Sequence, residues 1–200
     1  ADRLLGRLSK YNRDDACHWT VFNRNLIERV LEEHNLPDNF SKYLVEDKLS
    51  DIHSVINELL GVQPAQHILV KKFSETILHL ANIGNSIIVG RGATIVTSQL
   101  KNVFHVRLIA PFDKRVAYIQ RIKNLSKENA VEYVKREDEA RKNYVLVNFH
   151  KDVEDPHLYD LIINTGHINF ENAAEIIEDA VLKKYPNFFK RESHFFEMYY

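Results

Sequence analysis

The chain has 200 residues, of which 44% are hydrophobic and 28% are charged, and its formal net charge is −1. These values are typical of a globular domain and exclude a disordered chain and a globally basic nucleic-acid-binding protein. No apolar run reaches the roughly 18 residues of a membrane span, and the one cysteine, Cys17, has no partner for an internal disulfide. We therefore expect a cytoplasmic protein that binds neither membranes nor nucleic-acid polymers.

The first third of the chain has the apolar spacing of helices. The predicted helices cover residues 1–10, 23–34, 50–60 and 65–83, and glycines follow the last two as stop signals. The chain begins with Ala1 inside the first helical pattern, and its one methionine is Met198. We therefore expect a fragment or a processed chain that has lost the segment before this helix.

From residue 86 the pattern changes. The short β-branched run 86–89 predicts a buried parallel strand, and two further strands are predicted over 103–110, which Pro111 stops, and over 161–164. A long helical stretch over 112–152 separates the last two strands, and Asn169 is the expected cap of a helix over 170–185. Strands that alternate with helices favour an α/β fold with a mainly parallel sheet. The tail, 186–200, holds six aromatic residues and is expected to be packing surface.

The small net charge conceals an uneven distribution. Residues 114–151 contain ten Lys or Arg and five Asp or Glu, a local charge of +5, while the rest of the chain carries −6. One interpretation is a solvated helix whose charges pair one turn apart. The other is a lid for a polyanion, because the stretch lies between two predicted parallel strands, and open α/β folds bind ligands at the carboxyl edge of the sheet.

The most distinctive local motif is Gly90-Arg91-Gly92, which follows the predicted strand 86–89. Glycines there allow a tight turn and a close approach to a ligand, and an arginine at a strand end can grip phosphate oxygens in pairs. A tight turn with a surface arginine explains the tripeptide equally well. No phosphate loop of the form G-x-x-x-x-G-K-[ST] occurs. No His-x-x-x-His pair occurs either, and the single cysteine has no partner, so we expect no protein-bound metal.

Five segments in chain order carry a combined signal. They are WTVFNRNLI (19–27), GRG (90–92), FHVRLIA (104–110), DEARKNY (138–144) and DPHLYDLIINT (155–165). Together they resemble the cytidylate kinase-like family of P-loop nucleoside monophosphate kinases, and the similarity runs over about 1–185. The resemblance implies a three-layer fold, with a parallel sheet flanked by helices, that lacks its first strand and phosphate loop. It also implies one nucleotide-kinase-like domain over 1–200, with 112–152 as a helical lid and 186–200 as a tail.

The resemblance also implies roles for individual residues. Arg91, with Gly90 and Gly92, matches the strand end that grips the acceptor monophosphate. Arg24 lies on the acceptor side, where Asn23 replaces the aspartate of the family. Asp138 and Arg141 match the aspartate–arginine pair of the family's lid that recognises the base. Arg121 and Arg136 are weaker candidates for lid contacts to the phosphates of the donor nucleotide. Arg136 and Arg141 are the expected catalytic residues.

The implied reaction transfers the γ-phosphoryl group of ATP, with Mg²⁺, to CMP, dCMP or a similar monophosphate. Such transfer needs charge neutralisation and positioning more than covalent help from the protein. We expect this chain alone to be inactive, because the phosphate loop is absent. Two alternatives stay open, a non-catalytic nucleotide-binding module and a helical protein-interaction module, and the sequence leaves oligomerisation undecided.

Overall fold

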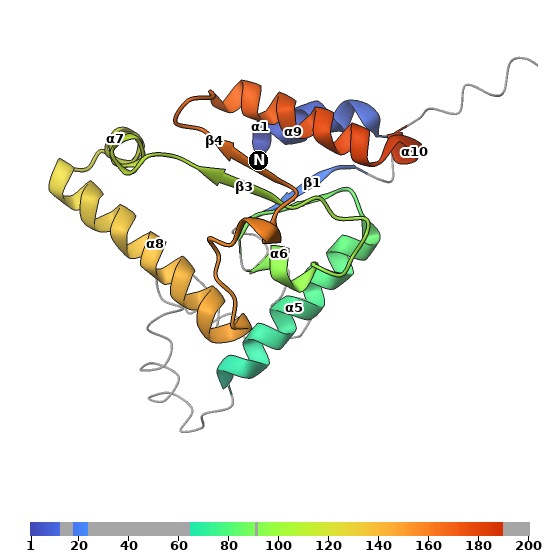
Figure 1. Ribbon diagram of the computed structural model, residues 1–200, viewed down its shortest axis with the longest axis horizontal. Coiled ribbons are helices and arrows are strands. Elements are labelled where there is room, and N and C mark those ends of the chain that lie inside the picture. Colours follow the sequence, from blue (N-terminus) through green and yellow to red (C-terminus); the bar gives the residue numbers. More distant parts are fainter. Residues whose placement is uncertain (13–17, 24–64, 91, 190–200) are drawn as a thin grey trace, which may run out of the picture.

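The computed structural model describes residues 1–12, 18–23, 65–90 and 92–189 (Figure 1). The predicted helices 23–34 and 50–60 lie almost wholly outside these residues. The described α-helices are α1 (Asp2–Leu8), α5 (Ala65–Ile83), α6 (Ala93–Val96), α7 (Phe112–Lys123), α8 (Lys127–Phe149), α9 (Phe170–Lys184) and α10 (Pro186–Phe189). None of them combines the length and apolarity that a bilayer crossing requires.

The strands form parallel pairs, as predicted, in a mixed α/β fold. Strand β1 (Thr20–Phe22) pairs with β2 (Ser86–Ile88), and β3 (Val106–Ile109) pairs with β4 (Leu161–Asn164). Among the described residues these are two separate two-stranded sheets rather than one continuous sheet.

Two strands differ from the prediction. Strand β1 was not predicted, because a run of three strand residues is too short to show an alternating pattern. The predicted strand 103–110 is shorter and begins at Val106. The residue before it, His105, is tied instead to the turn that precedes β4: its carbonyl accepts from the amides of Asp160 and Leu161.

The helix predictions hold for α5 and α9. Helix α5 covers 65–83 as predicted, and α9 begins after Asn169, whose side chain accepts a hydrogen bond from the amide of Asn172. The expected single stretch 112–152 is instead two helices. Asn124 adopts a left-handed conformation with φ of 52°, and Ser126 then caps α8. An asparagine followed by a capping serine is a local helix stop that the long polar pattern concealed.

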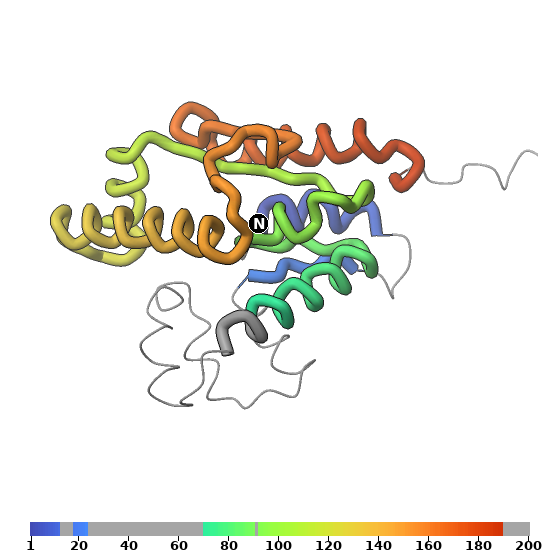
Figure 2. The backbone as a smooth tube through the Cα atoms, turned by 60° about the horizontal axis from the view of Figure 1, so that its bottom comes forward, coloured from blue at the N-terminus to red at the C-terminus, as the bar shows by residue number. Residues whose placement is uncertain are grey.

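Apolar side chains are buried in at least three places among the described residues. Helix α9 packs against β4 through Ile163, Ala173, Ile177 and Val181, and α1 lies along α9 (Figure 1). Helices α7 and α8 form a hairpin with its own small core of Val116, Ala130 and Val134. Helix α5 buries Phe73, Ile77, Leu80 and Ala81. Figure 2, turned from the first view, shows the hairpin in yellow extending to the left of the molecule. The hairpin is therefore a unit attached to the strands at its two ends.

Ion pairs join α1 to α9. The carboxylate of Glu178, which is 2% exposed, accepts hydrogen bonds from Arg7, from Lys10 at 2.6 Å and from Tyr11 at 3.2 Å. Burial works to raise the pKa of Glu178, but these hydrogen bonds outweigh it and the net pKa is lowered. The first helix is thus held in place by a satisfied buried charge.

The described part of the tail packs against the start of the chain. The ring of Phe189 lies 5.4 Å from that of Tyr11 and is stacked on Trp19 at 6.4 Å. These contacts agree with the expected packing role for 186–189, while 190–200 lie outside the described residues.

Candidate functional site

The strand-end motif lies against the end of α8. Gly90 and Gly92 flank Arg91, have φ of 83° and 68°, and connect β2 to α6. A Cβ atom on Gly92 would lie only 2.5 Å from the ring of Phe149, the last residue of α8. The close approach therefore requires glycine at 92. Arg91 itself lies outside the described residues.

Strand β1 ends at the same edge as this motif. Phe22 is paired with Ile88, and the amide of Val89 donates to the carbonyl of Phe22 at 2.8 Å. Asn23 follows β1 directly, and Arg24 is the next residue but lies outside the described part of the chain. The strand pairing thus brings the ends of β1 and β2, which precede Arg24 and Arg91 in the sequence, to one sheet edge.

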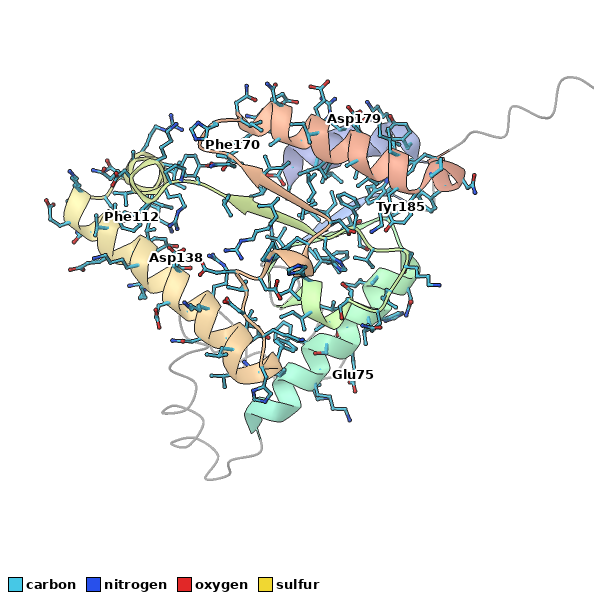
Figure 3. The ribbon with its side chains drawn as sticks, viewed as in Figure 1. Glu75, Phe112, Asp138, Phe170, Asp179 and Tyr185 are labelled. Carbon is cyan, nitrogen blue, oxygen red and sulfur yellow. The ribbon has the colours of Figure 1, made fainter. Side chains whose placement is uncertain are left out.

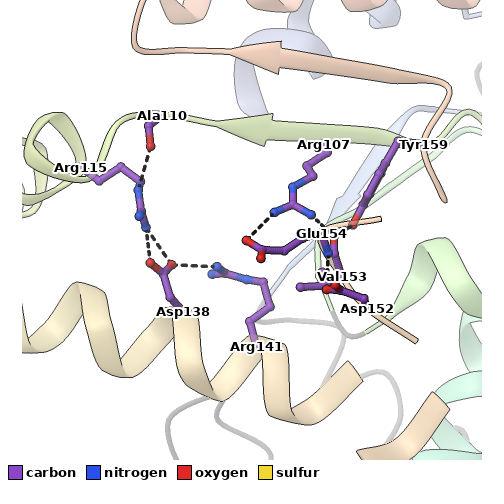
Figure 4. A network of polar contacts seen from close by, with 9 residues as sticks. All are labelled: Arg107, Ala110, Arg115, Asp138, Arg141, Asp152, Val153, Glu154 and Tyr159. Atoms are coloured by element: carbon purple, nitrogen blue, oxygen red, sulfur yellow. Dashed lines mark hydrogen bonds and ion pairs between the residues drawn. The ribbon is translucent and has the colours of Figure 1, made fainter. Parts of the chain in front are cut away.

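A carboxylate between two arginines lies on the hairpin. Asp138 of α8 is on the side of that helix that faces β3 (Figure 3). Its carboxylate accepts from Arg141 at 3.5 Å, one turn later on the same helix, as the spacing predicts. It also accepts from Nη1 of Arg115 on α7, at 2.7 and 2.6 Å to its two oxygens (Figure 4).

Arg115 is in turn fixed to the end of β3. Its Nε donates to the carbonyl of Ala110 at 3.1 Å, and its guanidinium lies 5.7 Å from the ring centre of Phe112. This arginine therefore connects a strand end, α7 and α8. We did not single out Arg115 from the sequence. The signal was its place one turn after Pro111, at the start of the helix that follows a strand.

A second arginine anchors the segment that follows α8. Arg107 on β3 donates to the carbonyl of Val153, pairs with Glu154 at 3.5 Å and lies 5.6 Å from the ring centre of Tyr159. Burial raises the pKa of Tyr159, and the charges of Arg107 and Arg141 oppose that rise. Both guanidiniums therefore act on the same tyrosine, and Figure 4 shows them on either side of Glu154.

The other two lid candidates lie apart from this network. The guanidinium of Arg121 is 5.6 Å from the ring centre of Tyr118 on its own helix, and that of Arg136 is 5.3 Å from Tyr133. Arg136 precedes Asp138 by two residues, which corresponds to about 200° around a helix. The structure brings Asp138 and Arg141 together and leaves Arg121 and Arg136 on other faces.

One cluster has the residue types of a hydrolytic triad without its geometry. Nε2 of His105 is 2.8 Å from the hydroxyl of Thr97, and its Nδ1 is 3.8 Å from Asp160. The threonine is 2% exposed and donates its one proton to the carbonyl of Ala93. It is thus a buried hydrogen-bonded residue with no access to a substrate, and the cluster joins α6 to the start of β3.

The arrangement pairs arginines with carboxylates. Three guanidiniums, those of Arg107, Arg115 and Arg141, lie in one network with three carboxylates, those of Asp138, Asp152 and Glu154, so their formal charges balance. Arginine forks are suited to phosphate oxygens, and a carboxylate beside them can accept from an amino group. No group of His, Cys, Asp and Glu suited to a metal ion occurs in the described part of the chain.

Comparison with known proteins gives two curated relatives. The chain is 21% identical over 164 residues to the cytidylate kinase of Methanocaldococcus jannaschii, which covers 80% of this chain and 92% of that protein. It is 28% identical over 100 residues to the uronate isomerase of Corynebacterium glutamicum. That match covers 50% of this chain and spans only 19% of the isomerase.

A solved structure and a family model complete the comparison. The crystal structure of an uncharacterized protein from Eubacterium ventriosum superposes with a TM-score of 0.55 at 20% identity. The superposition covers 79% of this chain and 90% of the Eubacterium ventriosum chain, which shows a shared fold. The sequence model of the cytidylate kinase-like family matches residues 15–167, a span that includes both strand pairs and the helical hairpin. The chain therefore belongs to the cytidylate kinase-like family.

Proposed function

We propose that this chain carries the acceptor site and the lid of a nucleotide kinase-like phosphotransferase. The reaction is the transfer of the γ-phosphoryl group of magnesium-bound ATP to CMP, dCMP or a similar monophosphate. Family membership supports the reaction class. The observation that carries the proposal is the contact of Gly92 with Phe149, because it puts the strand-end motif beside the helix that bears Asp138 and Arg141.

The proposed roles follow from this placement. Arg91 and Arg24 grip the acceptor phosphate, with Gly90 and Gly92 shaping the turn, and Asp138 with Arg141 recognises the base. Arg141 and Arg136 then stabilise the charge that develops on the transferred phosphoryl group, and Arg121 makes a further contact to the phosphates of ATP. For Arg121 and Arg136 the proposal requires a lid movement, because each now stacks on a tyrosine of its own helix.

For the fold, we propose that the two strand pairs are halves of one parallel sheet, flanked by helices on both faces in a three-layer fold of the P-loop type. The pairs support this, since both are parallel and each carries helices of the same chain. In the same proposal residues 1–200 form one domain, 112–152 move as its lid and 186–200 are a tail. Closure of such a lid would bring positive charge to the phosphates and exclude water from the donor.

A second candidate function is nucleotide binding without catalysis. Asn23 favours it, because an amide stands at the end of β1 where the family has a carboxylate. An amide keeps hydrogen bonding but supplies no negative charge for a sugar or metal contact. CMP-dependent formation of ADP by the protein expressed from its complete reading frame separates the two functions. Turnover supports the kinase, and CMP binding without turnover supports the binding module.

Calorimetric titration of this chain with CMP tests the acceptor site. We expect saturable binding that Arg91→Ala weakens at least tenfold, because a phosphate loses a bidentate charged contact. Arg3→Ala is the matched control, since Arg3 is an exposed arginine whose partner is Glu171 on the far side of the strands. The proposal is wrong if the unmodified chain binds none of the common nucleoside monophosphates.

A further inference from the structure

We infer that Arg115 is a positioning residue that presents Asp138 to the nucleobase and thereby sets a preference for bases with an exocyclic amino group. The inference rests on the proposed function and deepens it, since it names the residue that fixes the base-reading carboxylate. Arg115 itself need not touch the nucleotide.

The geometry supports an indirect role. The guanidinium of Arg115 is held on three sides, by the carbonyl of Ala110, by the ring of Phe112 and by both oxygens of Asp138. Ala110 directly follows β3, so Arg115 holds the side chain of Asp138 on α8 in a fixed position relative to the end of the strand. In contrast, Arg141 makes one long contact to Asp138 and has a side chain that is 53% exposed.

Asp138 keeps room for a ligand. An ionised carboxylate offers about four acceptor positions, and the two arginines make three contacts with it. The Asp138 side chain is 40% exposed, so solvent or a ligand reaches it. A carboxylate oxygen accepts from the amino group of cytosine and repels the carbonyl that uracil has at the same position. An Asp138 held in one orientation therefore favours CMP over UMP.

The test is the ratio of CMP to UMP affinity, measured by calorimetry on this chain. Arg115→Lys retains the positive charge but removes the planar fork that spans Ala110 and Asp138. We expect it to reduce the ratio about tenfold and to leave the affinity for ribose 5-phosphate unchanged. A structural role alone would lower the affinity for all three ligands together. Arg3→Lys is the control with the same chemical change at an exposed arginine outside the site.

A double-mutant cycle shows whether Arg115 acts through Asp138. We expect Asp138→Asn to abolish the preference for CMP, and Arg115→Lys to have no further effect on the ratio in that background. An unchanged ratio in Arg115→Lys, in a chain that binds CMP in preference to UMP, overturns the inference and leaves the proposed function standing. A chain that binds neither nucleotide overturns both. Urea unfolding of each variant confirms that the compared proteins are folded.

Discussion

The substitution Gly92→Ala tests the contact on which the proposed site depends. An added Cβ would lie 2.5 Å from Cε2 and 3.0 Å from Cζ of Phe149. Gly92 also has φ of 68°, a left-handed conformation that side chains adopt at a cost. The substitution therefore adds backbone strain and a steric conflict between the strand-end turn and the end of α8.

The two costs can be separated with a second glycine. Gly84 has φ of 84°, and a Cβ there would meet nothing within 4 Å. Gly84→Ala should therefore show the strain alone, about 1–2 kcal/mol of unfolding free energy. Gly92→Ala should lose about 1–3 kcal/mol more, the usual cost of overpacking a filled site.

Urea unfolding followed by circular dichroism measures both free energies, and CMP titration measures the effect on the site. We expect weaker CMP binding for Gly92→Ala, because relief of the conflict displaces either Arg91 or the end of α8. Phe149→Leu should recover part of the loss in the double variant, since a shorter side chain withdraws the conflicting ring atoms. If Gly92→Ala costs no more than Gly84→Ala, the turn and α8 are not in contact, and the argument for a shared site fails.

Two further predictions concern stability. Glu178→Gln should lower the unfolding free energy by about 2 kcal/mol at pH 7, because a buried carboxylate loses charged hydrogen bonds from Arg7 and Lys10. The folded-state pKa of Glu178 is lowered from 4.5, so the difference in unfolding free energy between the variant and the unmodified chain should shrink as the pH falls below 4.5. Urea unfolding measures this difference, and a difference that stays constant with pH would contradict the assignment. Burial lowers the pKa of His105 from 6.5, so the unfolded chain takes up this proton first and the folded chain loses stability as the pH falls through 6.5. His105→Gln should therefore have a shallower loss of unfolding free energy between pH 7.5 and 5.5, and an identical slope would refute the role of this histidine.

Local patterns predicted several elements well. Helix α5 has the predicted limits, and β4 coincides with the short apolar run Leu161-Ile162-Ile163 and the asparagine that follows it. Helix α9 needed only its asparagine cap and apolar stripe. These features depend on spacing within a few residues, which a sequence displays directly. The break between α7 and α8 was missed because its signal is confined to two residues, Asn124 and Ser126, within a long stretch that is otherwise helical.

The site divides in the same way. The pair Asp138–Arg141 could be predicted because residues three apart share a helical face, and the structure shows the contact. Arg115 could not be assigned to this pair, because its partner Asp138 lies 23 residues later, on the second helix of the hairpin. The same holds for Arg107, whose contacts at Val153 and Glu154 depend on the return of the chain toward β3 after α8.

The amino-acid sequence alone thus determined the type of several elements (α5, α9, β2 and β4), the parallel pairing, the positive charge of the hairpin region and the strand-end motif. These are properties of short segments, whose backbone preferences and side-chain periods act locally. The tertiary structure decided which segments meet: Gly92 with Phe149, and Arg115 with Asp138. Such contacts arise because burial of the apolar faces of α7, α8 and α9 brings distant parts of the chain together, and no local spacing encodes that distance.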